Sequence, residues 1–142
     1  MKRSRPRPKR KGSVRSLKKK LWLLFADYIK ERDGRVCFTC DKPVFGRDCQ
    51  AGHFVSCAKE FTRFDPENVH VQCRHENVFM KGNIPEYARR YLDRYGREKF
   101  DALMARSDRM RQWKPYQLEE LIAALKIGGA EYEMLYAERY SS

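Results

Sequence analysis

The sequence has no apolar run of about 18 residues, the length that a helix needs to cross a bilayer, so we predict no membrane partner. It also lacks the apolar stretch and small-residue cleavage site of a secretory signal peptide. Both absences predict a cytoplasmic protein whose five cysteines stay reduced. Under such conditions, closely spaced cysteines more often bind metal than form disulfides. With 142 residues, the chain has room for one modest hydrophobic core.

The first twenty residues contain no acidic side chain but carry eleven lysines and arginines, nearly the whole net charge of +12. The remaining 122 residues carry 20 basic and 19 acidic side chains and are close to neutral. Pro6 and Pro8 favour an extended backbone, so residues 1–15 are predicted to form a disordered basic arm. Such an arm neutralises phosphates without reading sequence; the alternatives are a solubilising tail or an address signal. The residues assigned to nucleic-acid contact are Lys2, Arg3, Arg5, Arg7, Lys9, Arg10, Lys11, Lys18, Lys19, Lys20, Lys59 and Arg63.

Apolar residues at helical spacing predict a helix over 17–32, ended by Asp33-Gly34. Helical spacing then fades, and the sequence favours two short strands, at Cys49–Val55 and Val69–Cys73. We therefore expect an α+β fold with its core over 36–84.

Helical spacing returns from Pro85 to Tyr95, where Gly96 interrupts it, and again over Lys99–Ala105. Pro115 begins another amphipathic segment that ends at Gly128-Gly129, and residues 131–140 could form a last short helix. These boundaries predict one domain over 16–127, followed by a short helix or tail over 128–142.

The cysteines indicate a metal site. Cys37 and Cys40 form a C-x2-C turn that directs two thiolates at one tetrahedral ion, and Cys73 adds a third sulfur. Zinc is the expected ion, with His75 as fourth ligand or Glu76 as the alternative. A domain this small also gains stability from a structural metal. The remaining two cysteines, Cys49 and Cys57, are expected to be small buried hydrophobic residues.

A second group of residues suggests catalysis. His53 follows a glycine on the first predicted strand, Asn68 opens the second, and Asn77 follows the cysteine cluster. This is the order of a His/Asn nuclease. Imidazole titrates near neutral pH and can act as general base, while an amide oxygen can bind Mg²⁺ or Mn²⁺. Asn68 can link the strands and hold the backbone of His53. Taken alone, His53 would instead be a structural histidine.

The chain resembles the NinG family of lambdoid phages, also called Rap, over most of residues 17–127. The matching motifs are Gln50-Ala51-Gly52-His53-Phe54, Thr62–Asp65, Asn68–Cys73, Asn77, Gly82-Asn83 and Tyr95-Gly96. The resemblance implies a small zinc-stapled ββα-metal core of the HNH type, flanked by an N-terminal helix and C-terminal helices. It also implies an Mg-dependent endonuclease for branched DNA such as Holliday junctions and D-loops, acting in the host cytoplasm.

Carried over by position, the resemblance makes His53 the general base, Asn68 the orienting residue and Asn77 a ligand of the catalytic metal. Cys37, Cys40 and Cys73 would hold zinc. Symmetric junction cleavage would be arranged most simply by a homodimer.

The sequence departs from the NinG family pattern at position 76 and from the wider His/Asn nuclease pattern at position 52, where a glycine is expected for the NinG family. Glu76 stands where family members commonly have a cysteine, and Gly52 stands where many His/Asn nucleases place a metal-binding aspartate. Gln50, Asp48, water or substrate phosphate remain as other ligands of the catalytic metal. Two further hypotheses stay open. One is a non-catalytic zinc-ribbon protein that binds nucleic acid; the other is an RNA-binding protein whose Phe61 and Phe64 stack on bases.

Overall fold

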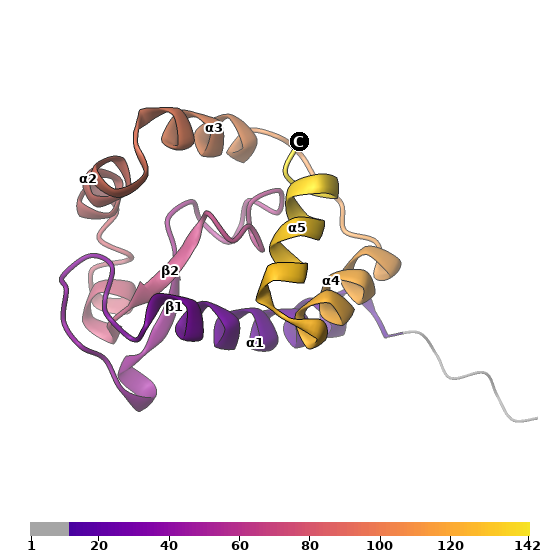
Figure 1. Cartoon of the computed structure of the whole chain (residues 1–142), viewed down its shortest axis with the longest axis horizontal. Helices are drawn as coiled ribbons and strands as arrows, with labels where there is room; N and C mark the ends of the chain where they lie inside the picture. The colour runs from indigo at the N-terminus through magenta and orange to yellow at the C-terminus, as the bar shows by residue number, and fades with distance from the viewer. Residues whose placement is uncertain (1–11) are drawn as a thin grey trace, which may run out of the picture.

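The computed structural model describes residues 12–142 (Figure 1). The residues of the predicted basic arm from Lys2 to Lys11 lie outside this range. Helices dominate the described part, and a single two-stranded sheet lies near its middle. In chain order the elements are α1 (Val14–Asp33), η1 (Gly46–Asp48), β1 (Gln50–His53), β2 (Val69–Gln72), η2 (His75–Phe79), α2 (Ile84–Tyr95), α3 (Arg97–Ser107), α4 (Pro115–Ile127) and α5 (Gly129–Arg139).

Helix α1 forms where the apolar spacing predicts it, but it begins at Val14 rather than 17. The side chain of Ser13 accepts a hydrogen bond from the backbone N–H of Ser16, which satisfies one free donor of the first turn. The helix ends at Gly34, whose φ of 67° is readily adopted by glycine. The serine cap therefore extends the helix into the predicted arm.

Strands β1 and β2 lie within the two predicted segments and pair antiparallel, with Gln50 opposite Gln72 and His53 opposite Val69. The end of α1 is tied to β2 through polar contacts. The carboxylate of Asp33 accepts from the Val71 N–H at 3.0 Å, and the guanidinium of Arg32 donates to the carbonyl of Val69 at 2.7 Å. These bonds fix α1 across the sheet.

The larger hydrophobic core joins α1, the sheet, α4 and α5. Helix α5 is part of this core and not a peripheral tail, because Tyr132 and Tyr136 are fully buried. Their hydroxyls donate to the carbonyls of Phe64 and Phe61, which anchors the loop between the strands. The boundary predicted at residue 127 therefore does not separate the last helix from the domain.

A smaller core forms where α2 and α3 cover the other side of the sheet region. Tyr87, Tyr91 and Leu103 pack there with Phe54 and Phe38. Gly96, with a φ of 87°, makes the predicted break between the two helices. Figure 1 shows α2 and α3 at one end of the molecule and the α4–α5 pair at the other.

The described fold is thus helix-rich, with a small two-stranded sheet, as an α+β prediction requires. The ββα prediction is not matched in full. After β2 the chain forms a five-residue π-helical turn, η2, and the next regular helix begins only at Ile84. No helix within residues 12–142 is long and apolar enough to cross a membrane.

Candidate metal centre and nucleic-acid groove

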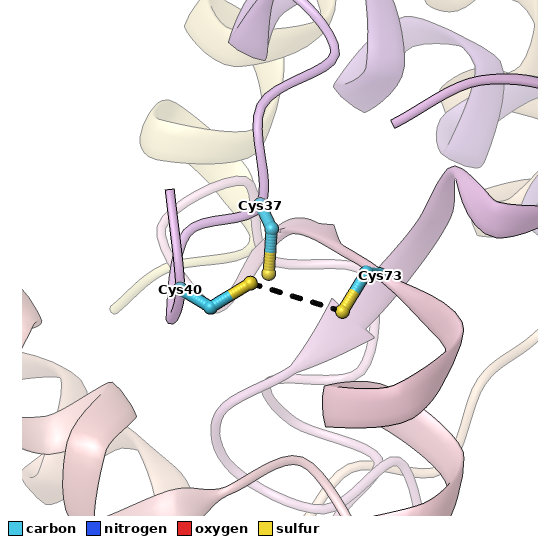
Figure 2. A group of neighbouring side chains, drawn as sticks. All are labelled: Cys37, Cys40 and Cys73. Carbon is cyan, nitrogen blue, oxygen red and sulfur yellow. Dashed lines mark hydrogen bonds between the residues drawn. The ribbon is translucent and has the colours of Figure 1, made fainter. Parts of the chain in front are cut away.

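Three cysteines, two from the turn at 37–40 and one directly after β2, converge at one end of the sheet (Figure 2). The sulfur atoms of Cys37, Cys40 and Cys73 all lie within 4.8 Å of one another. Cys40 and Cys73 are 3.9 Å apart. Two sulfurs bound to one tetrahedral zinc at about 2.3 Å are separated by about 3.8 Å. The cluster can therefore hold a metal ion such as zinc with little rearrangement.

The two candidates for the fourth ligand point in different directions. Glu76 is buried, its N–H donates to the sulfur of Cys73 at 3.5 Å, and one of its carboxylate oxygens has no hydrogen-bond partner within the described chain. His75 is exposed and lies against the ring of Phe79. A buried carboxylate oxygen without a partner is costly unless a cation or proton satisfies it. Neither side chain places a ligand atom within 4.8 Å of all three sulfurs, so burial and the unpartnered oxygen are what favour Glu76 over exposed His75.

His53 has one ring nitrogen engaged. Its Nε2 lies 2.8 Å from the carbonyl oxygen of Arg63, in the loop that joins the strands. A carbonyl only accepts, so Nε2 carries the proton and Nδ1 of the neutral ring holds the lone pair. Trp22 stacks on the ring, with centroids 4.9 Å apart. Burial lowers the pKa of His53 from its ordinary value, which keeps the ring neutral.

Asn68 fixes the same loop. Its side-chain oxygen accepts from the Val55 N–H at 2.7 Å, and its nitrogen donates to the carbonyls of Val55 and Thr62, each at 3.0 Å. The side chain is fully buried. Asn68 therefore holds the backbone two residues beyond His53.

Asn77 lies on η2 beside a groove between that turn, α1 and the start of β1. Its amide nitrogen donates to the side-chain oxygen of Gln50 at 2.9 Å. The groove has a volume of about 770 Å³, and Trp22 and Ala51 also line it. Its basic residues are Lys30, Arg47 and Arg74, with one acid, Asp27.

His53 is not one of the residues lining this groove. Trp22 is the link between the two, because it stacks on His53 and also lines the groove with Asn77. The sequence pattern identifies His53 and Asn77 as candidate site residues, but it does not identify Trp22, which links them. A signal was present: Trp22 follows Leu21 on α1 and falls outside the apolar stripe.

Several of the predicted cationic contacts are engaged in ion pairs. Lys18 and Arg63 both pair with Glu60, at 2.7 and 3.2 Å, and Lys59 lies 3.7 Å from Asp108. Lys19 and Lys20 are exposed and form no ion pair within residues 12–142. Of the predicted nucleic-acid contacts in the described range, these two are the most available to phosphates.

Two sequence expectations are wrong. Cys57 is exposed, not buried, because it lies in the turn-rich loop after β1; Cys49 is buried as expected. Phe61 and Phe64, which the RNA hypothesis assigned to base stacking, are buried in the protein. Phe64 packs edge-on against Phe25 and Trp113. Neither ring is available to a nucleic acid in this structure.

The fold and the cluster define a class first: a small helix-rich α+β protein whose three thiols suit a metal ion such as zinc. Within that class, the chain belongs to the family described as Bacteriophage Lambda NinG protein, which matches residues 2–131.

Relatives in two phages support this assignment. The chain is 31% identical to Protein ninG of Escherichia phage 933W over 86 residues, which cover 59% of this chain and 42% of that protein. It is 29% identical to Protein ninG of Enterobacteria phage H19B over 102 residues, 71% of this chain and 48% of that protein. The matched stretch thus spans less than half the length of these relatives. No solved structure matches the chain significantly.

Proposed function

We propose that this chain is a metal-dependent DNA endonuclease that hydrolyses phosphodiesters in branched recombination intermediates such as Holliday junctions and D-loops. The observation that carries the proposal is the state of His53. Its Nε2 is committed to the Arg63 carbonyl, which leaves the lone pair of Nδ1 free to take a proton from water. Family membership is the second support.

Each polar residue has a defined role in the proposed reaction. His53 acts as general base, and Asn68 holds the loop that carries the carbonyl partner of its ring. Asn77 supplies an oxygen ligand. A bound magnesium or manganese ion would stabilise negative charge on the scissile phosphate and the leaving oxygen. Lys30, Arg47 and Arg74 would pair with the DNA backbone along the groove.

The thiol cluster has a structural role in this proposal. Zinc held by Cys37, Cys40, Cys73 and Glu76 would fix η2, and with it Asn77, against the sheet. A Glu76→Ala variant should bind zinc less tightly in competition with a chelator, whereas His75→Ala should bind it normally. Equal zinc loss in both variants, or loss in His75→Ala alone, would contradict this ligand assignment.

The proposal is tested by incubating zinc-loaded protein with Mg²⁺ or Mn²⁺ and labelled four-way junctions, D-loops, flaps and linear duplexes. We expect metal-dependent cleavage of the branched DNAs and little cleavage of the duplex. Failure to cut any of them would rule out the nuclease.

Binding is measured in the same preparations across a range of salt concentrations. Deleting residues 2–11 removes seven positive charges, so the dependence of log Kd on log salt should become shallower. An unchanged slope would show that the arm does not contact phosphates.

One observation favours a second function, a zinc-containing protein that binds DNA without cutting it. His53 does not line the groove that holds Asn77 and the basic residues. Under this alternative, Asn77→Ala would leave the biological activity unchanged, and junction binding would occur without cleavage. The cleavage assay above separates the two functions.

A further inference from the structure

Position 52 has no room for a side chain. A Cβ atom built on Gly52 would lie 1.9 Å from Oε1 of Gln72 and 2.7 Å from its Cδ. Gln72 is fully buried, and its amide nitrogen donates to Oγ1 of Thr39 at 3.1 Å and to the carbonyl of Gly82 at 2.9 Å. Because these bonds hold Gln72 in place, an aspartate before the histidine would not fit. A second protein ligand for a catalytic cation has to come from another position.

Gln50 lies on the same face of β1, two residues before Gly52. Its Oε1 accepts from the amide nitrogen of Asn77 at 2.9 Å. Two oxygens bound at right angles to an octahedral magnesium ion, at 2.0–2.1 Å, lie about 2.9 Å apart. The oxygen and nitrogen of a carboxamide exchange places on a half-turn of its terminal torsion. A half-turn of Asn77 thus brings two oxygens to the spacing of neighbouring magnesium ligands.

The nearby carboxylates are less suited to the role. Asp48 accepts from the backbone N–H of Arg74 at 3.0 Å and pairs with Lys42 at 3.2 Å; these bonds lower its pKa. Asp27 lines the groove from α1 but is exposed. Gln50 alone among these side chains directly contacts the candidate ligand Asn77.

We propose that Gln50 and Asn77 together bind a divalent cation, Mg²⁺ or Mn²⁺, through their side-chain oxygens, with Gln50 replacing the aspartate that position 52 excludes. Two neutral ligands bind such a cation weakly, so water and a substrate phosphate complete the coordination. Arg47 and Arg74 line the same groove and can hold that phosphate. The use of the cation in hydrolysis rests on the proposed function, but its binding does not.

The test uses zinc-loaded full-length protein without DNA, so that the thiols are already occupied. Manganese is titrated while the side-chain NH₂ signals of asparagine and glutamine are followed by NMR. We expect paramagnetic broadening of the Gln50 and Asn77 signals at the lowest manganese concentrations. The signal of Gln112, which is exposed in the loop before α4, should broaden last.

Variants sharpen this test. Gln50→Glu replaces a neutral ligand with a carboxylate and should bind manganese about tenfold more tightly. Gln50→Ala should lose the site, and thermal melting checks that it folds. Gln112→Glu adds the same charge elsewhere and should leave the affinity unchanged. The inference is overturned if both Gln50 variants bind manganese like the wild type, or if Asp27→Asn abolishes binding while Gln50→Ala does not.

Parallel cleavage assays separate this inference from the proposed function. Manganese bound at Gln50 and Asn77, without cleavage of any branched DNA, would end the nuclease proposal and leave the cation site. Normal cleavage by Gln50→Ala would show that the cation bound by Gln50 and Asn77 does not serve in hydrolysis, and would leave the nuclease.

Discussion

The two strands of the sheet each carry one histidine, and the two rings lie on opposite faces. His53 is opposite Val69, while His70 is opposite Gly52, so the pleat directs them to different sides. His53 lies on the side of α1, where Trp22 stacks on it. His70 lies on the side of α2, where Phe38 stacks on it at 4.3 Å.

Hydrogen bonds distinguish the two rings more sharply than burial does. The hydroxyl of Tyr87 donates to the carbonyl of Gly52 at 2.9 Å, so it can only accept from Nδ1–H of His70. Nε2 of the neutral ring then accepts from the hydroxyl of Tyr95 at 3.0 Å. Both nitrogens of His70 are thus engaged, and burial lowers its pKa to about 3.

His53 has one engaged nitrogen and one lone pair without an assigned partner in the described chain. Both nitrogens of His70 are bonded to tyrosine hydroxyls inside the protein, so the buried ring offers no lone pair to water or substrate, whereas the lone pair of His53 can accept a proton. Both rings are neutral at neutral pH, so the pKa does not separate their roles. The hydrogen-bond partners of the ring nitrogens separate the two roles. They make His53 the candidate base and His70 a structural residue.

The largest expected effect follows from replacing His53. His53→Ala should lower the cleavage rate by about 10²- to 10⁴-fold, because it removes the general base. Junction binding should change little, since the ring carries no positive charge at neutral pH. Single-turnover cleavage and gel-shift titration measure the two quantities.

Exposed His75 provides the matched control, and His75→Ala should cut DNA at the wild-type rate. Near-normal cleavage by His53→Ala would contradict the assignment of the base.

Replacing His70 should have the opposite outcome. His70→Phe keeps a planar aromatic ring but leaves the Tyr95 hydroxyl without its buried partner. We expect a loss of about 1–3 kcal/mol in the free energy of unfolding, measured with urea, and a normal cleavage rate for the folded fraction. A catalytic defect without loss of stability would reverse the roles of the two histidines.

The sequence allowed this contrast to be predicted only in part. The alternation of residues 50–53 and 69–72 predicts the strands, and the spacing of Cys37, Cys40 and Cys73 predicts their convergence. Which of the adjacent residues His75 and Glu76 turns inward depends on the π-helical turn, which no sequence pattern indicates.

The sequence also did not predict the packing between segments far apart in the chain. The stacking of Trp22 on His53 and the burial of Phe61 under α5 depend on contacts between segments far apart in the chain. Composition and periodicity do not carry that information.

The third expected effect is a change in the free energy of unfolding at acidic pH. An unfolded histidine titrates near pH 6.5, whereas His70 in the folded protein titrates at about 3. The stabilising effect of neutral His70 is therefore complete above pH 6.5. It declines as the pH falls below 6.5, because only the unfolded state then binds a proton there, at a cost of at most about 1.4 kcal/mol per pH unit.

Phenylalanine does not titrate, so His70→Phe does not lose stability in this way. The difference in unfolding free energy between wild type and variant should therefore shrink as the pH falls from 7 to 5. Urea unfolding at three pH values measures it. A difference that stays constant over this range would show that His70 is not held neutral.

The smallest expected effect is on the pKa of His53 and follows from replacing Trp22. Trp22→Leu removes the ring stacked on His53 and admits water to that face. Burial is the largest cause of the lowered pKa of His53, so the pKa should rise toward 6.5. The base form is lost as the pH falls through this pKa, and the acid limb of the cleavage profile should therefore move to higher pH.

At pH 8, where His53 is neutral in both proteins, we expect less than about a tenfold change in rate, since the general base itself remains. Glu31→Gln, at an exposed position of α1 that does not line the groove, should leave the profile unchanged. A shift of equal size in both variants would indicate a general disturbance of α1 and remove Trp22 from the environment of the base.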